Sequence, residues 1–102
     1  DGGASVEAAR EAAKVCALNL IHCLKLACDG DLDRVEAVMR LGGFVNCTPR
    51  FPWSPKVIDG ATAVFRDVFG EDGVHARTAV GVAGLPGDAA VEVDAIVTLK
   101  RD

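Results

Sequence analysis

The chain has 102 residues, half of them hydrophobic and a quarter charged, and its 11 Lys and Arg against 15 Asp and Glu give a formal net charge of −4 at pH 7. This length and composition predict a single globular domain over residues 1–102. No apolar run approaches the roughly 18–20 residues that a membrane-spanning helix requires, which argues against a membrane partner. The basic residues are scattered rather than gathered in a dense patch, which argues against nucleic acid as a partner.

A long helix is predicted over residues 5–28, a stretch rich in Ala and Leu without Pro or Gly. Ser5 is a suitable N-cap, and Glu7 stands in the first turn, where the helix dipole favours an acidic side chain. Polar residues recur at helical spacing and leave a wide apolar face that suits packing on a sheet. Asp29, Gly30 and Asp31 then end the helix and form a turn.

A strand with one buried face is predicted next, over residues 34–46. Alternate apolar side chains are expected to share that buried face, namely Val35, Ala37, Met39 and Leu41. The adjacent glycines Gly42 and Gly43 indicate either a β-bulge or the close approach of another part of the chain.

A proline-containing loop leads into a second helix over residues 54–69. Ser54 is predicted as its N-cap and Pro55 as its first helical residue, because the fixed φ of proline suits that position. Gly70 follows where a C-terminal glycine cap is expected. One face of this helix gathers apolar side chains expected to be buried, namely Val57, Ile58, Ala61, Val64, Phe65 and Val68.

Two further strands are predicted over residues 76–83 and 91–99, joined by the turn-forming residues 84–88. The order of elements is therefore α-β-α-β-β, and the fold class is α+β. Three strands are few for two amphipathic helices. We therefore expect the sheet to continue between subunits and through strands that precede Asp1.

Four cysteines, Cys16, Cys23, Cys28 and Cys47, lack the spacing of a zinc site and form no C-x-x-C pair. The three in or beside the first helix are interpreted as small buried hydrophobic residues, and no metal or other cofactor is predicted. Free cysteines are typical of a reducing compartment, so a cytoplasmic location is expected.

Four segments stand out by their order and spacing. They are residues 42–46 (Gly-Gly-Phe-Val-Asn), 55–61 (Pro-Lys-Val-Ile-Asp-Gly-Ala), 75–86 (His-Ala-Arg-Thr-Ala-Val-Gly-Val-Ala-Gly-Leu-Pro) and 91–97 (Val-Glu-Val-Asp-Ala-Ile-Val). This series resembles the RidA/YjgF/UK114 family, in particular its YjgF-like branch with a chorismate-mutase-like fold. The resemblance covers essentially the whole chain.

The resemblance implies a sheet with two helices packed on one face and three copies assembled around a central barrel. It implies a homotrimer that holds a small carboxylate-bearing ligand in a cleft between subunits. Relatives carry further strands before the first helix, and these supply part of the cleft wall.

The resemblance also implies roles for individual residues. Members of the type class hydrolyse reactive imines and enamines to 2-oxo acids and ammonia. Arg77 stands where an arginine holds the substrate carboxylate, and Glu92 stands where a glutamate positions or activates the water. The chemistry suits these residue types, since a guanidinium pairs with a carboxylate through two parallel bonds and a carboxylate can move a proton.

Two positions depart from the family pattern. Ala79 stands where many relatives carry a cysteine, two residues after the arginine, and Asp59 replaces an asparagine near the start of the second helix. Both are assigned to the substrate-binding site with Arg77. Because an anion beside a carboxylate ligand is unfavourable, either a different substrate or one that is not an anion is expected.

Simpler interpretations stay open for these residues. Arg77 and Glu92 are alternatively a surface ion-pair residue and a solvated carboxylate. His75 is interpreted as a loop histidine in preference to a catalytic base. Phe51 and Trp53 are interpreted as packing or subunit-contact residues in preference to a ligand-stacking pair. A non-catalytic trimeric ligand-binding or regulatory module is the alternative to the hydrolase, and an endoribonuclease or translation inhibitor, labels that family members also carry, is the third function.

Overall fold

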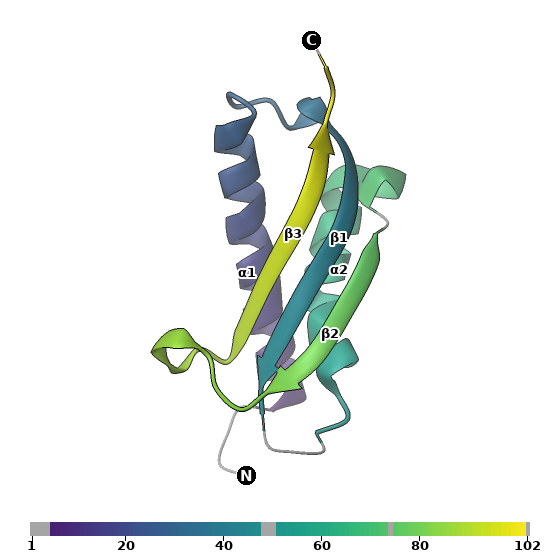
Figure 1. Ribbon diagram of the computed structural model, residues 1–102. Helices are drawn as coiled ribbons and strands as arrows, with labels where there is room; N and C mark the ends of the chain where they lie inside the picture. The colour runs from purple at the N-terminus through teal and green to yellow at the C-terminus, as the bar shows by residue number, and fades with distance from the viewer. Residues whose placement is uncertain (1–4, 48–50, 74, 102) are drawn as a thin grey trace.

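The computed structural model describes residues 5–47, 51–73 and 75–101. It confirms the α+β class and the predicted order of elements (Figure 1). The main elements are α1 (Val6–Ala27), β1 (Val35–Asn46), α2 (Ser54–Phe69), β2 (Ala76–Val82) and β3 (Val91–Leu99), with short 3-10 helices at Leu32–Arg34, Gly70–Gly73 and Pro86–Asp88. The first part of the proline loop, residues 48–50, lies outside the described residues.

Strand β1 is the centre of a three-stranded sheet in the order β2-β1-β3. It runs parallel to β2 and antiparallel to β3. The chain passes from β1 to β2 through α2, because parallel neighbours need a crossover connection. Both helices lie on one face of the sheet, as predicted, and leave the other face without a helix in the part of the chain that the structure describes (Figure 1).

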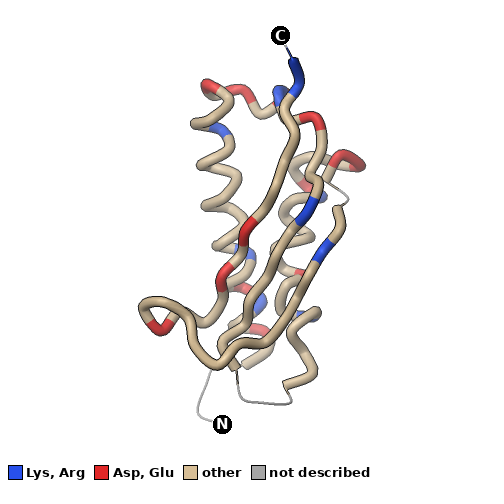
Figure 2. The backbone as a smooth tube through the Cα atoms, in the orientation of Figure 1, with Lys and Arg blue, Asp and Glu red and all other residues tan. Residues whose placement is uncertain are grey.

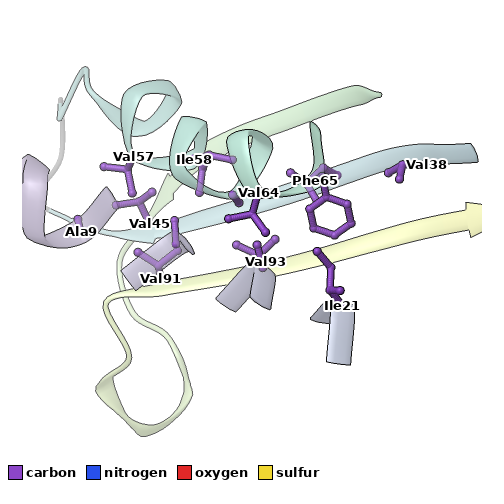
Figure 3. Packing of buried hydrophobic residues seen from close by; sticks show 14 residues of the cluster. Ala9, Ile21, Val38, Val45, Val57, Ile58, Val64, Phe65, Val91 and Val93 are labelled. Atoms are coloured by element: carbon purple, nitrogen blue, oxygen red, sulfur yellow. The ribbon is translucent and has the colours of Figure 1, made fainter. Parts of the chain in front are cut away.

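The hydrophobic core lies between the sheet and the two helices (Figure 3). Its largest fully buried side chains are Phe65, Leu41, Ile58, Val57 and Cys28. The helices approach each other through small residues, because Ala13 and Ala17 of α1 are fully buried. A Cβ atom at Gly60 of α2 would collide with the carbonyl oxygen of Arg10. Glycine at position 60 therefore sets the close contact between α1 and α2.

Helix α1 begins and ends as predicted. The Ser5 hydroxyl accepts a hydrogen bond from the backbone N–H of Ala8 at 3.1 Å. The four cysteines are unpaired; Cys28 is buried and Cys16 half-buried, but Cys23 is exposed, so the expectation of buried cysteines is wrong for Cys23. No helix among the described residues is both long and apolar enough to span a membrane.

The predicted alternation along β1 is wrong in its first half. Met39, expected in the core, is 53% exposed, whereas Val38 is 2% exposed. The cause is a pair of register shifts against β3, between Val35 and Ala37 and again between Val38 and Arg40. Each irregularity adds a residue and moves the following side chains to the other face.

Of the two expectations for the paired glycines, the close approach is correct. A Cβ atom at Gly43 would collide with the Ile58 side chain of α2, so this glycine lets the helix settle on β1. The register shifts of β1 lie earlier in the strand, before Leu41.

Helix α2 confirms Pro55 in its first turn and Gly70 as its C-cap, with φ of 61°. The N-cap prediction is wrong, because the cap residue is Trp53 and Ser54 is already helical. The Ser54 hydroxyl is buried without a hydrogen-bond partner among the described residues. Val68, expected in the core, is 43% exposed, whereas the following residue, Phe69, packs against the core.

Strands β2 and β3 form the two edges of the sheet. β2 ends at Val82, one residue earlier than predicted, and β3 has the predicted bounds. Val91 and Val93 point into the core, but Leu99 at the other end of β3 is 40% exposed. The helices therefore cover only the first part of β3.

Candidate functional site

Arg77 lies on edge strand β2 with its side chain on the helix face. Its Nη1 donates to Asp59 Oδ1 at 2.7 Å and to Thr62 Oγ1 at 3.1 Å, both on α2. Asp59 and Thr62 are three residues apart, so they stand on one side of the helix, one turn from each other. The structure thus brings together two of the predicted site residues, Arg77 and Asp59, in an ion pair whose side chains are 24% and 49% exposed.

This ion pair uses only part of the arginine. A guanidinium has five N–H donors, and the hydrogen bonds to Asp59 and Thr62 both engage Nη1. Nε and Nη2 have no hydrogen-bond partner among the described residues. The edge they form is the one a carboxylate pairs with through two parallel bonds.

A cavity of about 230 Å³ opens beside this arginine. It is lined by Thr62 and Arg66 of α2, by His75 and by Arg77. Two guanidinium groups therefore face one small volume. Sequence reasoning missed Thr62 and Arg66, although with Asp59 they share one side of the helix at intervals of three and four residues.

His75 stands next to the two arginines at the start of β2. Its Nδ1 lies 3.2 Å from the carbonyl oxygen of Ala76, which fixes that nitrogen as the donor, and its Nε2 is buried without a partner among the described residues. Burial lowers the pKa of His75 most, and the nearby charges of Arg77 and Arg66 lower it further, against the opposing Ala76 hydrogen bond. The ring is therefore neutral at pH 7 and packs edge-on against Phe65, with centroids 6.5 Å apart.

Glu92 lies away from this cavity. It follows the core residue Val91 on β3, so its side chain points to the face without helices, and it is exposed. In the sheet, Arg77 of β2 is paired with Leu41 of β1, and Glu92 of β3 is paired with Phe44 of β1. Within one chain the predicted catalytic carboxylate and the predicted carboxylate-binding arginine thus lie on opposite faces and opposite edges of the sheet. Beyond burial, the charge of Glu92 raises the pKa of the Cys16 thiol.

Ala79, the remaining predicted site residue, is half-buried on the helix face of β2 beside the core. It pairs with Gly43 and offers only a methyl group. The position where relatives carry a thiol therefore adds no polar group to the cavity here.

The two loop aromatics have different environments. Phe51 packs against the core, as interpreted from sequence. Trp53 is 49% exposed, with Lys56 Nζ 5.3 Å from its ring centroid. Among the described residues, no group of three or more His, Cys, Asp and Glu side chains is placed to hold a metal ion.

A two-helix, three-stranded α+β unit with these segments in this order defines a known class. The family model described as "YjgF/chorismate mutase-like, putative endoribonuclease" matches residues 2–97, and the chain belongs to this family. The resemblance stated from sequence is thereby confirmed.

Individual relatives agree with this assignment. Protein TCP17 of Trypanosoma cruzi is 50% identical over 98 residues, which cover 95% of this chain and 61% of TCP17. The crystal structure of Atu1372, a protein of unknown function from Agrobacterium tumefaciens, superposes with a TM-score of 0.94 at 44% identity over 96% of this chain and 62% of its own. A "putative endoribonuclease" from Shewanella oneidensis MR-1 gives a TM-score of 0.90 at 31% identity over 96% and 64%. This chain thus spans less than two thirds of the length of each relative.

Proposed function

We propose that this protein binds a small carboxylate-bearing substrate through Arg77 and hydrolyses a reactive imine or enamine to a 2-oxo acid and ammonia. The observation that carries the proposal is the geometry of Arg77. Asp59 and Thr62 hold Nη1 and fix the side chain beside the cavity, while Nε and Nη2 remain available. A fixed guanidinium edge suits a carboxylate, because little side-chain freedom is lost on binding.

The reaction consumes one water. The water oxygen bonds to the carbon of the C=N group, the C–N bond then breaks, and protons of the water move to the nitrogen, which leaves as ammonia. Glu92 accepts a proton from the water and returns it to the nitrogen. Because the imine carbon is already electrophilic, holding substrate and water in place supplies much of the acceleration.

A site that contains both Arg77 and Glu92 needs a second copy of the chain, since one sheet separates them. The proposal therefore includes a homotrimer with the ligand in a cleft between subunits. The uncovered face of the sheet supports it, because Val80 and Ile96 there are 40% and 59% exposed. A small domain gains stability by burying such side chains between copies.

Sedimentation velocity tests the assembly. Wild type is expected to sediment as a trimer at micromolar concentration, and Ile96→Asp to dissociate it, because a charge would be buried at the interface. Leu26→Asp, on an exposed position of α1, is the matched control. A monomeric wild type would contradict the shared cleft.

Turnover is tested with freshly generated 2-imino acids by following ammonia release. Wild type is expected to accelerate release, and Glu92→Gln to bind the 2-oxo acid product normally while losing turnover, because an amide keeps the shape but cannot accept the proton. Asp94→Asn, two residues along the same face of β3, is the control. Full activity in Glu92→Gln would remove this residue from the mechanism.

The second candidate is a trimeric module that binds small carboxylates without chemistry. Asp59 compensates the charge of Arg77 at 2.7 Å, and Ala79 supplies no thiol, and both observations favour this reading. Arg77-dependent binding of a 2-oxo acid by a wild type that releases no ammonia would establish it over the hydrolase.

Ribonuclease activity is the third candidate, because the family description and the Shewanella relative carry that name. Against it, the Lys and Arg residues are spread over helices and strands rather than gathered in one strip (Figure 2). If the trimer cleaves a mixed RNA substrate and Arg77→Ala abolishes the cleavage, ribonuclease activity would be favoured over the other two candidates. A cytoplasmic location belongs to the same proposal, supported by four unpaired cysteines.

A further inference from the structure

We propose that Arg66 is the second anion-binding arm of the Arg77 cavity, and that the charge balance of this cavity selects monocarboxylates over dicarboxylates. The inference rests on the ligand site of the proposed function and names its substrate class. It starts from the observation that two guanidinium groups line one small volume but only one of them is paired.

Arg66 reaches the cavity from the last turn of α2, four residues after Thr62. The four-residue spacing places it one helical turn from Thr62 on the same side of the helix. Its side chain is exposed and forms no ion pair in the part of the chain that the structure describes. Arg77, by contrast, is fixed by Asp59 and Thr62. One arginine is therefore a rigid wall of the cavity, and the other is a free cation at its rim.

The charges around the cavity sum to one positive unit. Arg77 and Asp59 cancel as a pair at 2.7 Å, Arg66 adds one positive charge, and His75 is neutral at pH 7. Both arginine charges act on the His75 ring, which agrees with their common position beside it. A ligand with one carboxylate therefore balances the charge that one chain contributes to the site. The Glu92 carboxylate that the proposed function brings from a second copy adds a negative charge and disfavours a second anionic group.

A second carboxylate would meet no further cation. Thr62 and the neutral His75 complete the lining, and a partly buried charge without a partner is unfavourable. The cavity volume of about 230 Å³ indicates a small ligand, and the charge balance rather than the volume distinguishes a monocarboxylate from a dicarboxylate of equal length. The ligand class is therefore a small 2-oxo or 2-imino acid with an uncharged tail.

A matched pair of probes tests this selection. 2-Oxopentanoate and 2-oxoglutarate have five carbons each and differ by a terminal methyl or carboxylate group. Isothermal titration calorimetry on the trimer is expected to show that 2-oxopentanoate binds at least about tenfold more tightly than 2-oxoglutarate. Asp59→Asn raises the site to two positive charges and is expected to reverse the preference, because the terminal carboxylate then finds an uncompensated guanidinium.

Arg66 is tested by two substitutions. Arg66→Gln is expected to weaken 2-oxopentanoate binding about 10- to 100-fold, the usual effect of losing a charge-assisted contact. Arg66→Lys keeps the charge and is expected to retain the preference for the monocarboxylate with lower affinity. Arg101→Gln, an exposed arginine near the C-terminal end, is the control, and thermal unfolding checks that each variant is folded.

The outcomes separate this inference from the proposed function. If Arg66→Gln binds both acids as wild type does while Arg77→Gln loses binding, the selection by Arg66 is wrong and the Arg77 site stands. Equal affinity of wild type for the two acids also overturns the selection. If wild type binds neither acid, the proposed ligand site fails and this inference fails with it.

Discussion

The two edges of the sheet differ in the chemistry of the seam that each forms with its helix. Between α2 and β2, a cavity of about 230 Å³ is lined by Thr62, Arg66, His75 and Arg77, and Asp59 pairs with Arg77 beside it. Between α1 and β3, a groove of similar size, about 250 Å³, is lined almost entirely by apolar side chains, namely Leu20, Cys23, Leu24, Ala27, Ala95 and Val97.

This difference separates stability from recognition within one small domain. An apolar seam can contribute only through contact with other apolar groups, whereas fixed charges beside a cavity can discriminate among small ions. The α1–β3 side is therefore expected to govern the free energy of unfolding, and the α2–β2 side to govern ligand affinity. Each prediction below changes one side and asks whether the other responds.

The largest effect is expected from Ile21→Ala, on the apolar side. Ile21 is 8% exposed and packs in the core from α1. Removing its buried methylene and methyl groups is expected to lower the free energy of unfolding by about 2–5 kcal/mol, measured by urea titration. Leu18→Ala, at a position that is 50% exposed on the same helix, should change it by only about 0.5 kcal/mol. Similar losses in the two variants would contradict the assignment of the core.

Arg77→Lys comes next, on the polar side. An ammonium cannot reproduce the two-pronged contact, so affinity for a 2-oxo acid is expected to fall about 10- to 100-fold, nearly as far as in Arg77→Ala. Unfolding is expected to change little, because an ion pair this exposed contributes at most about 1 kcal/mol. A lysine variant that binds as wild type does would show that Arg77 acts only as a point charge.

The elements of the fold were readable from sequence because their signals are local. Ser5 at the start of α1 and Gly70 at the end of α2 act through neighbouring backbone groups. The errors came from contacts between distant segments. Met39 is exposed because β1 shifts register against β3, which no alternation within residues 34–46 could reveal.

The site was less readable for the same reason. The family pattern pointed to Arg77 and Asp59, but only the packing of β2 on α2 shows that they are partners at 2.7 Å. Arg66 belongs to no motif, and its role depends on the cavity alone. Glu92 is separated from Arg77 by the sheet, and whether they meet depends on contacts between copies of the chain.

A smaller effect is expected from pH through His75, beside the polar seam. Its pKa is lowered from 6.5 in the folded chain, chiefly by burial. The unfolded state therefore binds more protons below about pH 6.5, and stability falls as pH decreases from there through the lowered pKa. Above about pH 6.5 the imidazole is neutral in both states, and protonation of His75 no longer lowers the free energy of unfolding. His75→Phe should remove that part of the pH dependence in urea titrations, with His22→Phe on α1 as the control. An unchanged slope in His75→Phe would contradict the assignment.

The smallest effect concerns Cys16 of α1 and Glu92 of β3, both at the α1–β3 edge of the sheet. Its thiol pKa is raised, first by burial and then by the charge of Glu92, so little thiolate forms near neutral pH. Removing that charge in Glu92→Gln lowers the pKa of the Cys16 thiol and therefore increases the thiolate fraction. Because the thiolate is the nucleophile, Cys16 becomes more reactive. Alkylation of Cys16 by iodoacetamide at pH 7.5 is expected to become a few-fold faster, while exposed Cys23 on the same helix reacts at an unchanged rate. Peptide mass spectrometry over time separates the two cysteines. If the alkylation of Cys16 and of Cys23 accelerates together, the substitution has loosened α1. If neither rate changes, the charge of Glu92 does not act on Cys16, and the assignment is wrong.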